Sequence, residues 1–214
     1  AFGMALELGA SEQRVYSRTE SEAGKTLVTI GNRFSELTFE PARGGRCVRF
    51  RLHDTGEQLI GTTAVSGMFI DHWAKYPWPS ALMWLPYQHR LVGDGETRVG
   101  IELWVEVPPT GGGKGASTPE PSGEMPTSPE LVGLVVRKTV WLDADRDVIE
   151  VEHAVENPTK SSRAVAAYVQ HTLSMGGSSY HDNWYLPSGR GVVVNIQPGV
   201  KGGRAIGPDW VLDP

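Results

Sequence analysis

The fold is decided by residues 134–177, which read LVVRKTVWLDADRDVIEVEHAVENPTKSSRAVAAYVQHTLSMGG. Apolar and polar residues alternate over three segments of this stretch, with the period of two that β-strands show. The segments are residues 134–142, 148–156 and 164–173, and turn sequences rich in Asp, Asn and Ser separate them. We therefore predict three consecutive strands, each with one face toward a core and the other toward solvent or a ligand.

Three polar residues fall on the apolar sides of these strands, namely Lys138, His153 and His171. If the second and third strands pair as a hairpin that closes symmetrically around their turn, Glu152 faces Tyr168. The two histidines then lie four residues apart along the hairpin, about 13 Å at the usual rise per residue. We therefore expect that they do not share a metal ion, and that the opposite face is the working surface.

The composition is that of a soluble globular protein of 214 residues, with 39% hydrophobic and 21% charged residues. The net charge of −5 is spread along the chain without a clustered basic patch, which argues against nucleic acid and membranes as partners. Cys47 is the sole cysteine, which excludes an intrachain disulfide and a cysteine metal cluster. We predict that it is a small buried residue rather than a reactive thiol. No cofactor and no metal site are expected.

Strand patterns also dominate the rest of the chain, and long helical periodicity is missing. Residues 46–52 alternate clearly, with Val48, Phe50 and Leu52 predicted to point inward. Residues 98–107 carry five apolar side chains on one face. These patterns predict an all-β fold.

The chain is expected to form one domain with two less regular parts. We expect an N-terminal tail or edge strand over residues 1–23, and a single β-sandwich over residues 24–214. Residues 108–130 are rich in Pro, Gly, Ser and Thr, which predicts a flexible insertion within that domain. The chain begins with Ala1, which fits either removal of a signal peptide or a shortened chain. The compartment and oligomeric state stay open, with a periplasmic or secreted location favoured.

Two aromatic segments interrupt the strands. Residues 66–93 hold three of the seven Trp residues together with three prolines, and residues 176–192 place an aromatic loop between glycine and proline signals. Such loops either contact a ligand or plug the open end of a sandwich with a small core of their own. In the second loop, His181, Asp182 and Trp184 are candidate ligand contacts. His181 and Asp182 are adjacent, and two adjacent residues rarely form a metal site alone.

The polar sides of three strands share a composition that suits a sugar. Trp104 lies between two glutamates, Trp141 follows Arg137 by four residues, and Tyr168 precedes Gln170 by two. The C–H face of a pyranose packs on an aromatic ring, while guanidinium, amide and carboxylate groups bind its hydroxyls. The alternative is a solvated sheet face on which Trp and Tyr occur because they favour strands.

Two stretches resemble the galactose mutarotase-like superfamily, to which the aldose 1-epimerases belong. LTFEPARGGRCVRFRLHDTGEQLIG, residues 37–61, is similar to the opening strands of its β-sandwich. Residues 137–177 resemble its succession of a strand, an Asp-rich turn, a second strand and a strand that ends in His and Gly. The resemblance covers roughly residues 25–60 and 134–192. It implies a large antiparallel β-sandwich, or supersandwich.

In the epimerases of this superfamily, a histidine of that last strand is the general acid, and it corresponds to His171. A second histidine or an arginine from an earlier loop binds the sugar, and His89 and Arg90 are the nearest matches. The family's catalytic glutamate comes from a late strand, and no glutamate follows Glu156 in this chain. The chain also ends at Pro214, short of a typical member, so the resemblance implies a sandwich that is incomplete at its C-terminus.

Three functions stay open, and in the first two the partner is a mono- or oligosaccharide. The first is a carbohydrate-binding or carbohydrate-processing accessory protein, which holds the sugar on the aromatic and acidic sheet face and its adjoining loops. The second is an aldose 1-epimerase-type isomerase, with His171 and His89 as its catalytic residues. The third is a structural sandwich without a ligand. The candidate sugar-binding residues are Arg90, Trp104, Arg137, Trp141, Tyr168, Gln170, His181, Asp182 and Trp184.

Overall fold

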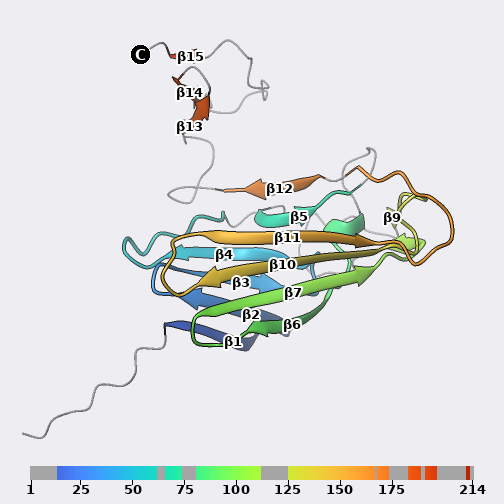
Figure 1. Ribbon diagram of the computed structural model, residues 1–214, viewed down its shortest axis with the longest axis horizontal. Coiled ribbons are helices and arrows are strands. Elements are labelled where there is room, and N and C mark those ends of the chain that lie inside the picture. Colours follow the sequence, from blue (N-terminus) through green and yellow to red (C-terminus); the bar gives the residue numbers. More distant parts are fainter. Residues whose placement is uncertain are drawn as a thin grey trace, which may run out of the picture.

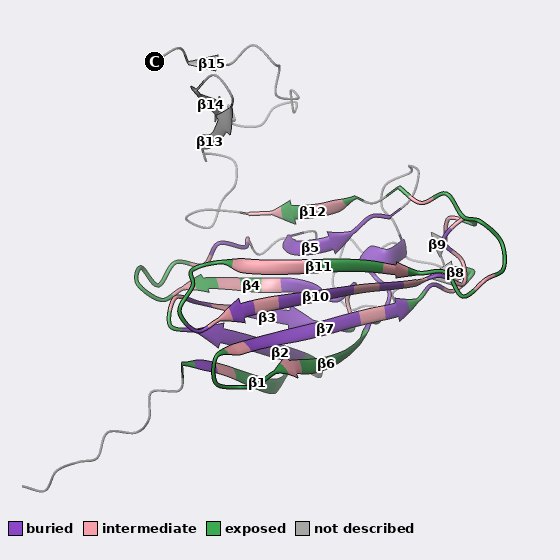
Figure 2. Ribbon diagram, viewed as in Figure 1, coloured by how far each residue is buried: buried purple, intermediate pink, exposed green. Residues whose placement is uncertain are grey.

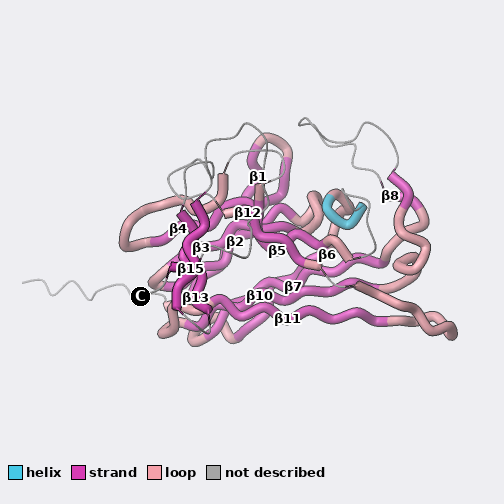
Figure 3. Tube along the Cα trace, turned by 90° about the horizontal axis from the view of Figure 1, so that it is seen from above, coloured by secondary structure: helices cyan, strands magenta, loops and turns pink. Residues whose placement is uncertain are grey.

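The computed structural model describes residues 14–61, 66–73, 81–111, 125–166, 168–173, 183–188, 191–196 and 211–212. Two antiparallel sheets, of six and four strands, face each other as the layers of a β-sandwich (Figures 1 and 3). The helical content of the described residues is a single 3₁₀ turn, η1 (Ala81–Met83). Within these same residues, no helix has the length and apolar character needed to cross a membrane. The predicted all-β sandwich is confirmed.

The six-stranded sheet contains the first five strands of the chain and one late strand. These are β1 (Val15–Glu22), β2 (Lys25–Asn32), β3 (Ser35–Glu40), β4 (Arg46–Leu52), β5 (Gly67–Asp71) and β12 (Val169–Thr172). Their order in the sheet is β1-β2-β3-β4-β5-β12, and all neighbours are antiparallel. Strand β12 is therefore an edge strand that joins the sheet from a distant part of the sequence.

The four-stranded sheet is built from the middle of the chain. It contains β6 (Gln88–Gly93), β7 (Arg98–Glu106), β10 (Val135–Asp143) and β11 (Ile149–Glu156), in the order β11-β10-β7-β6. The ends of the predicted insertion pair as β8 (Thr110–Gly111) and β9 (Met125–Pro126), and its residues 112–124 lie outside the described part of the chain. A separate three-stranded sheet consists of β13 (Asn183–Ser188), β14 (Gly191–Ile196) and β15 (Val211–Leu212).

The core lies between the two large sheets and follows from the alternation of β7 and β10 (Figure 2). The five apolar side chains predicted on one face of residues 98–107 are all buried. They belong to one cluster with Ile30, Leu37 and Phe39 of the six-stranded sheet. Burial of such a side chain contributes roughly 1.5–3 kcal/mol, so β7 and β10 anchor the sandwich.

A register shift between β3 and β4 changes the inward side of β4. Phe39 pairs with Cys47, whereas Thr38 pairs with Arg49. Cys47 is consequently buried in the core, as predicted, and burial raises the pKa of its thiol to about 12. The prediction that Val48 points inward is wrong, because the shift leaves it partly exposed beside a surface hollow.

The hairpin predicted for the last two strands of residues 134–177 does not form. Strand β11 pairs with β10, whereas β12 crosses to the other sheet and pairs with β5. Strand β12 pairs with the otherwise free edge of β5. Val165, which precedes β12 in the sequence, and Leu173, which follows it, pack against the core. The turn signal at Asn157-Pro158 correctly predicts that a strand ends, but it carries no information about which sheet the next strand joins.

Residues 66–93 contain more regular structure than the aromatic loop that we predicted. They include β5, η1 and β6. Trp73 and Tyr87 are buried in the main core, and Trp84 is buried in a small second cluster. These described aromatic residues fill the sandwich. This matches the second of the two alternatives predicted for the loop, a small core that plugs the sandwich rather than a set of ligand contacts.

Candidate functional site

The side of the four-stranded sheet that points away from the core carries part of the predicted sugar-binding set. We call this side the outer face. Cross-strand register places Gln88, Trp104 and Arg137 in one row across β6, β7 and β10. Arg90 and Glu102 lie opposite each other in the next row. Arg90, Trp104 and Arg137 are therefore neighbours, although they come from three strands.

Ion pairs link the side chains of the outer face. Glu102 accepts a hydrogen bond from Arg137 Nη1 at 2.7 Å and also pairs with Arg90, and its side chain is only 9% exposed. Arg137 Nη2 lies 3.1 Å from Glu156 as well. The Arg137 guanidinium is 5.4 Å from the centre of the partly exposed Trp104 ring. An aromatic ring is thus bordered by donors and acceptors that hold one another in place.

Trp141 shares the outer face, is also partly exposed, and packs against neighbours on β7. It lies opposite Gly100, and a Cβ atom at that glycine would come within 2.4 Å of Trp141 Cε3, so one side of the ring rests on the glycine. The Arg98 guanidinium lies 4.5 Å from the ring centre on the other side and pairs with Glu150. The indole Nε1 is buried and has no hydrogen-bond partner among the described residues. Both tryptophans are partly exposed, and Trp141 is the one whose ring packs directly on the backbone of a neighbouring strand.

A second candidate site lies at the edge of the sandwich, and we call it the edge cluster. It consists of Asp71 on β5, Lys138 on β10, His153 on β11 and His171 at the end of β12. It therefore combines the three polar residues that the sequence places on apolar strand faces with an aspartate of the six-stranded sheet. Asp71 pairs with both Lys138 and His153, and His171 contacts the ring of Phe69, whose carbonyl binds Lys138.

A buried ion pair forms the floor of the edge cluster. Lys138 Nζ lies 2.8 Å from Asp71 Oδ2, and both side chains are fully buried. The same carboxylate accepts hydrogen bonds from Tyr87 Oη at 2.9 Å and from Trp73 Nε1 at 3.1 Å. Burial lowers the pKa of Lys138, and the adjacent carboxylate opposes that effect. Because Lys138 and Asp71 belong to different sheets, the pair ties the two layers together at this edge.

Backbone strain accompanies this ion pair. Phe69 has a φ of +58°, a conformation that costs a bulky residue roughly 1–3 kcal/mol. Its carbonyl accepts a hydrogen bond from Lys138 Nζ at 2.6 Å, and its ring meets the His171 ring edge-on at 5.1 Å. The strained residue therefore contacts both the buried cation and one of the two histidines.

His153 and His171 form the solvent side of the edge cluster. The His153 side chain is 22% exposed and its Nε2 lies 3.8 Å from Asp71 Oδ1, while His171 is exposed. Burial lowers the pKa of both imidazoles, and a charge on His153 lowers the pKa of His171 further. The predicted hairpin spacing of these histidines is wrong, because they approach from different sheets. Across the described residues, no three His, Cys, Asp or Glu side chains are grouped as a metal site requires.

Tyr168 and Gln170 lie apart from the outer face, because β12 joins the other sheet. Gln170 is opposite Ile70, and the 56% exposed Tyr168 packs against the His72 ring at 5.5 Å between centres. Burial lowers the pKa of His72 to about 4. These residues form a small polar group on the side of β12 that faces away from His171.

The remaining predicted residues are not brought to either site. His89 is exposed opposite Leu103, on the other side of β6 from Arg90. Because β6 and β11 are the two outermost strands of their sheet, His89 lies roughly 14 Å from the strand of His153. His181 and Asp182 lie outside the described residues, and for Trp184 only the backbone, in β13, is described.

Asp71, Trp73 and Tyr87 are the members of the buried network that sequence patterns did not reveal. Lys138 was visible as a cation on an apolar face, and a buried cation requires a counter-charge. Asp71 directly follows the apolar run Met68–Ile70, which is the signal that could have identified it as that partner. The aromatic and proline-rich surroundings concealed the short strand β5.

No protein-family model matches the sequence, and no curated protein matches it. Among solved structures, the chain is similar to a TPR-domain containing protein from Parabacteroides distasonis ATCC 8503, with a TM-score of 0.46 and 10% sequence identity. The match covers 64% of this chain and 22% of that protein. A likeness of this size carries no argument about fold or function.

Proposed function

We propose that this chain is a carbohydrate-binding accessory protein and that its sugar packs on Trp104 of the outer face. One observation carries the proposal: a partly exposed indole ring lies in register with the Gln88 amide and the Arg137 guanidinium, next to the Glu102 carboxylate. A pyranose has an apolar C–H face and a rim of hydroxyl groups. Its face matches the ring, and its hydroxyls match the surrounding donors and acceptors.

Calorimetric titration with a panel of oligosaccharides tests this proposal. We expect saturable binding to the wild type and at least about tenfold weaker binding to Trp104→Ala, because aromatic anchors dominate the energy of a small interface. Trp141→Ala is the matched control, because its ring already packs on Gly100 and beside Arg98, and the affinity of this variant should stay within about twofold of the wild type. Circular dichroism verifies that both variants are folded. Wild-type protein that binds no oligosaccharide, or equal losses in the two variants, refutes the proposal.

A second function, aldose 1-epimerase-type isomerisation, is favoured by the two histidines of the edge cluster. Mutarotation needs a proton donor at the ring oxygen and a proton acceptor at the anomeric hydroxyl. Burial lowers the pKa of both imidazoles, and each neutral imidazole carries one ring nitrogen that donates a proton and one that accepts a proton. Such a pair supports a donor and an acceptor at the same place.

Polarimetry of freshly dissolved aldoses separates this function from simple binding. We expect His171→Gln and His153→Gln each to slow mutarotation by about 10²-fold or more, the usual contribution of a positioned acid or base. His89→Gln should keep the wild-type rate, because its strand is at the far edge of the sheet. Equal rates in the wild type and His171→Gln exclude the edge cluster, and a slow His89→Gln variant favours the pair implied by the family resemblance instead.

A further inference from the structure

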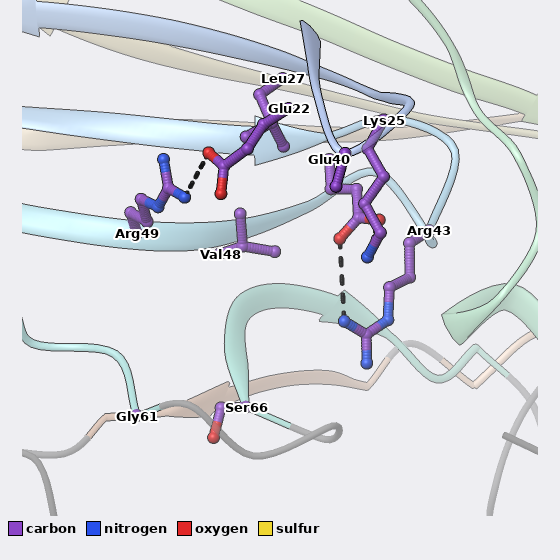
Figure 4. Close-up of a pocket in the computed structure, with 10 residues that line it drawn as sticks. Glu22, Lys25, Leu27, Glu40, Arg43, Val48, Arg49, Gly61 and Ser66 are labelled. Atoms are coloured by element: carbon purple, nitrogen blue, oxygen red, sulfur yellow. Dashed lines mark hydrogen bonds and ion pairs between the residues drawn. The ribbon is translucent and has the colours of Figure 1, made fainter. Parts of the chain in front are cut away.

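A charged hollow on the six-stranded sheet belongs to neither of the sites described so far. It has a volume of about 270 Å³ and lies between the β1–β2 turn, the β3–β4 turn and β4 (Figure 4). Leu27 and Val48 provide its apolar lining, and Gly61 and Ser66 complete one wall. The charged side chains around it are Glu22, Lys25, Glu40, Arg43 and Arg49.

Two sets of ion pairs lie on different sides of the hollow (Figure 4). In the first, Arg49 Nη2 is 2.6 Å from Glu22, and these side chains are 45% and 58% exposed. In the second, Lys25 and Arg43 both approach Glu40, at 3.1 and 3.7 Å. The Glu40 side chain is only 8% exposed, so two cations neutralise one nearly buried carboxylate.

The charge balance of this lining runs against that of the whole chain. Three basic and two acidic side chains leave a formal charge of +1, whereas the chain as a whole carries −5. Lysine and arginine side chains donate hydrogen bonds and accept none, so a ligand that meets them must supply acceptors. A local positive charge in a concave surface also concentrates anions.

We propose that this hollow binds a small polar molecule through one carboxylate or phosphate group, which is held between Arg49 and Lys25 above Val48. A guanidinium fork matches the oxygen spacing of both groups, and an ammonium adds a point charge. The volume is slightly below the roughly 300–1,000 Å³ of pockets for drug-sized ligands, so the occupant is small. The inference shares no residue with the outer face or the edge cluster and is independent of the carbohydrate proposal.

Thermal unfolding of the full chain tests the inference, with inorganic phosphate, acetate or lactate as the probe and ionic strength held constant with NaCl. A ligand that binds only the native state raises Tm with its concentration. We expect at least one of these anions to raise Tm saturably and neutral acetamide, which is close to acetate in size, to leave it unchanged. The comparison of phosphate with the two carboxylates identifies the group that is preferred.

Three single substitutions assign the effect to the hollow. Arg49→Gln should weaken the apparent affinity about tenfold, because it removes a charge-assisted hydrogen bond. Glu22→Gln should strengthen binding, since it removes a carboxylate that competes for Arg49 and repels an anionic ligand. Arg51→Gln removes the same charge two residues further along β4, outside the lining, and should leave binding unchanged. The inference is overturned if no probe raises Tm above the NaCl control, or if Arg49→Gln and Arg51→Gln weaken binding equally.

Discussion

Replacement of Lys138 by methionine is the most direct test of how the two sheets are held together. The substitution keeps most of the side-chain volume but removes the ammonium group, which contacts Asp71 Oδ2 at 2.8 Å and the carbonyls of Phe69 and Gly44 at 2.6 and 3.1 Å. The Asp71 carboxylate stays buried, with the neutral donors Tyr87 and Trp73 but without its counter-charge. Removal of one partner of a buried ion pair costs about 3–5 kcal/mol.

The loss can be measured as the free energy of unfolding in urea, with the slope m compared between variants. For a domain of this size, 1 kcal/mol corresponds to roughly 2–4 °C in Tm, so Lys138→Met should lower Tm by about 6–20 °C. Arg137→Met is the matched control, because it removes a cation from the adjacent position on β10, where the side chain is 26% exposed. A partly exposed ion pair contributes about 1 kcal/mol or less, so this control should lose far less stability.

A double-mutant cycle decides whether the cost arises from the unpaired charge. Asp71→Asn removes the negative charge and keeps an oxygen that can accept from Tyr87. We expect Lys138→Met combined with Asp71→Asn to lose less stability than the sum of the two single losses, by up to about 3 kcal/mol. Strictly additive losses, or equal stability of Lys138→Met and Arg137→Met, would refute the role assigned to the pair.

Three other perturbations follow from the described side chains. Folding holds the pKa of His72 at about 4. The free energy of unfolding should therefore fall by up to about 3 kcal/mol as the pH drops from about 6.5 to about 4. The urea midpoint of His72→Gln should depend less on pH than that of the wild type. The Cys47 thiol is buried with a pKa of about 12, so it should react with a chromogenic disulfide reagent only after denaturant unfolds the chain; rapid reaction of the native protein would contradict its burial. Gly100→Ala should destabilise the chain by about 1–3 kcal/mol, because its new methyl group displaces the Trp141 ring. In a Trp141→Ala background the same change should cost much less. Chemical denaturation measures both losses.

Alternation along single strands was sufficient to predict the all-β fold and the buried faces of its central strands. Residues 98–107 show their buried face directly, because five apolar side chains repeat at the period of a strand. The outer-face neighbours Trp104 and Arg137 follow from the same count, once β7 and β10 are paired. Lys138 stood out as an exception to the pattern, and this exception proved to be the cation of the buried ion pair.

The parts that could not be predicted depend on contacts between residues that are distant in sequence. The partner of β12 is the edge of β5, and no local signal distinguishes that edge from the edge of β11. The register shift that buries Cys47 and exposes Val48 depends on how β3 and β4 fit together. The packing of Trp141 depends on Gly100 and Arg98, which lie on another strand. Residue type alone therefore carries no information about the neighbours of Trp141 and Trp104.

The late edge strand β12 also has a consequence for the timing of assembly. Its pairing with β5 joins residues that are about 100 positions apart, and it comprises only four residues. Contacts of such long range form late in folding, and short edge strands open with little free energy. Amide protons of β12 should consequently exchange with solvent well before those of β7 or β10. Each opening would carry His171 away from His153, so the edge cluster exists as a complete site only while this one strand is docked.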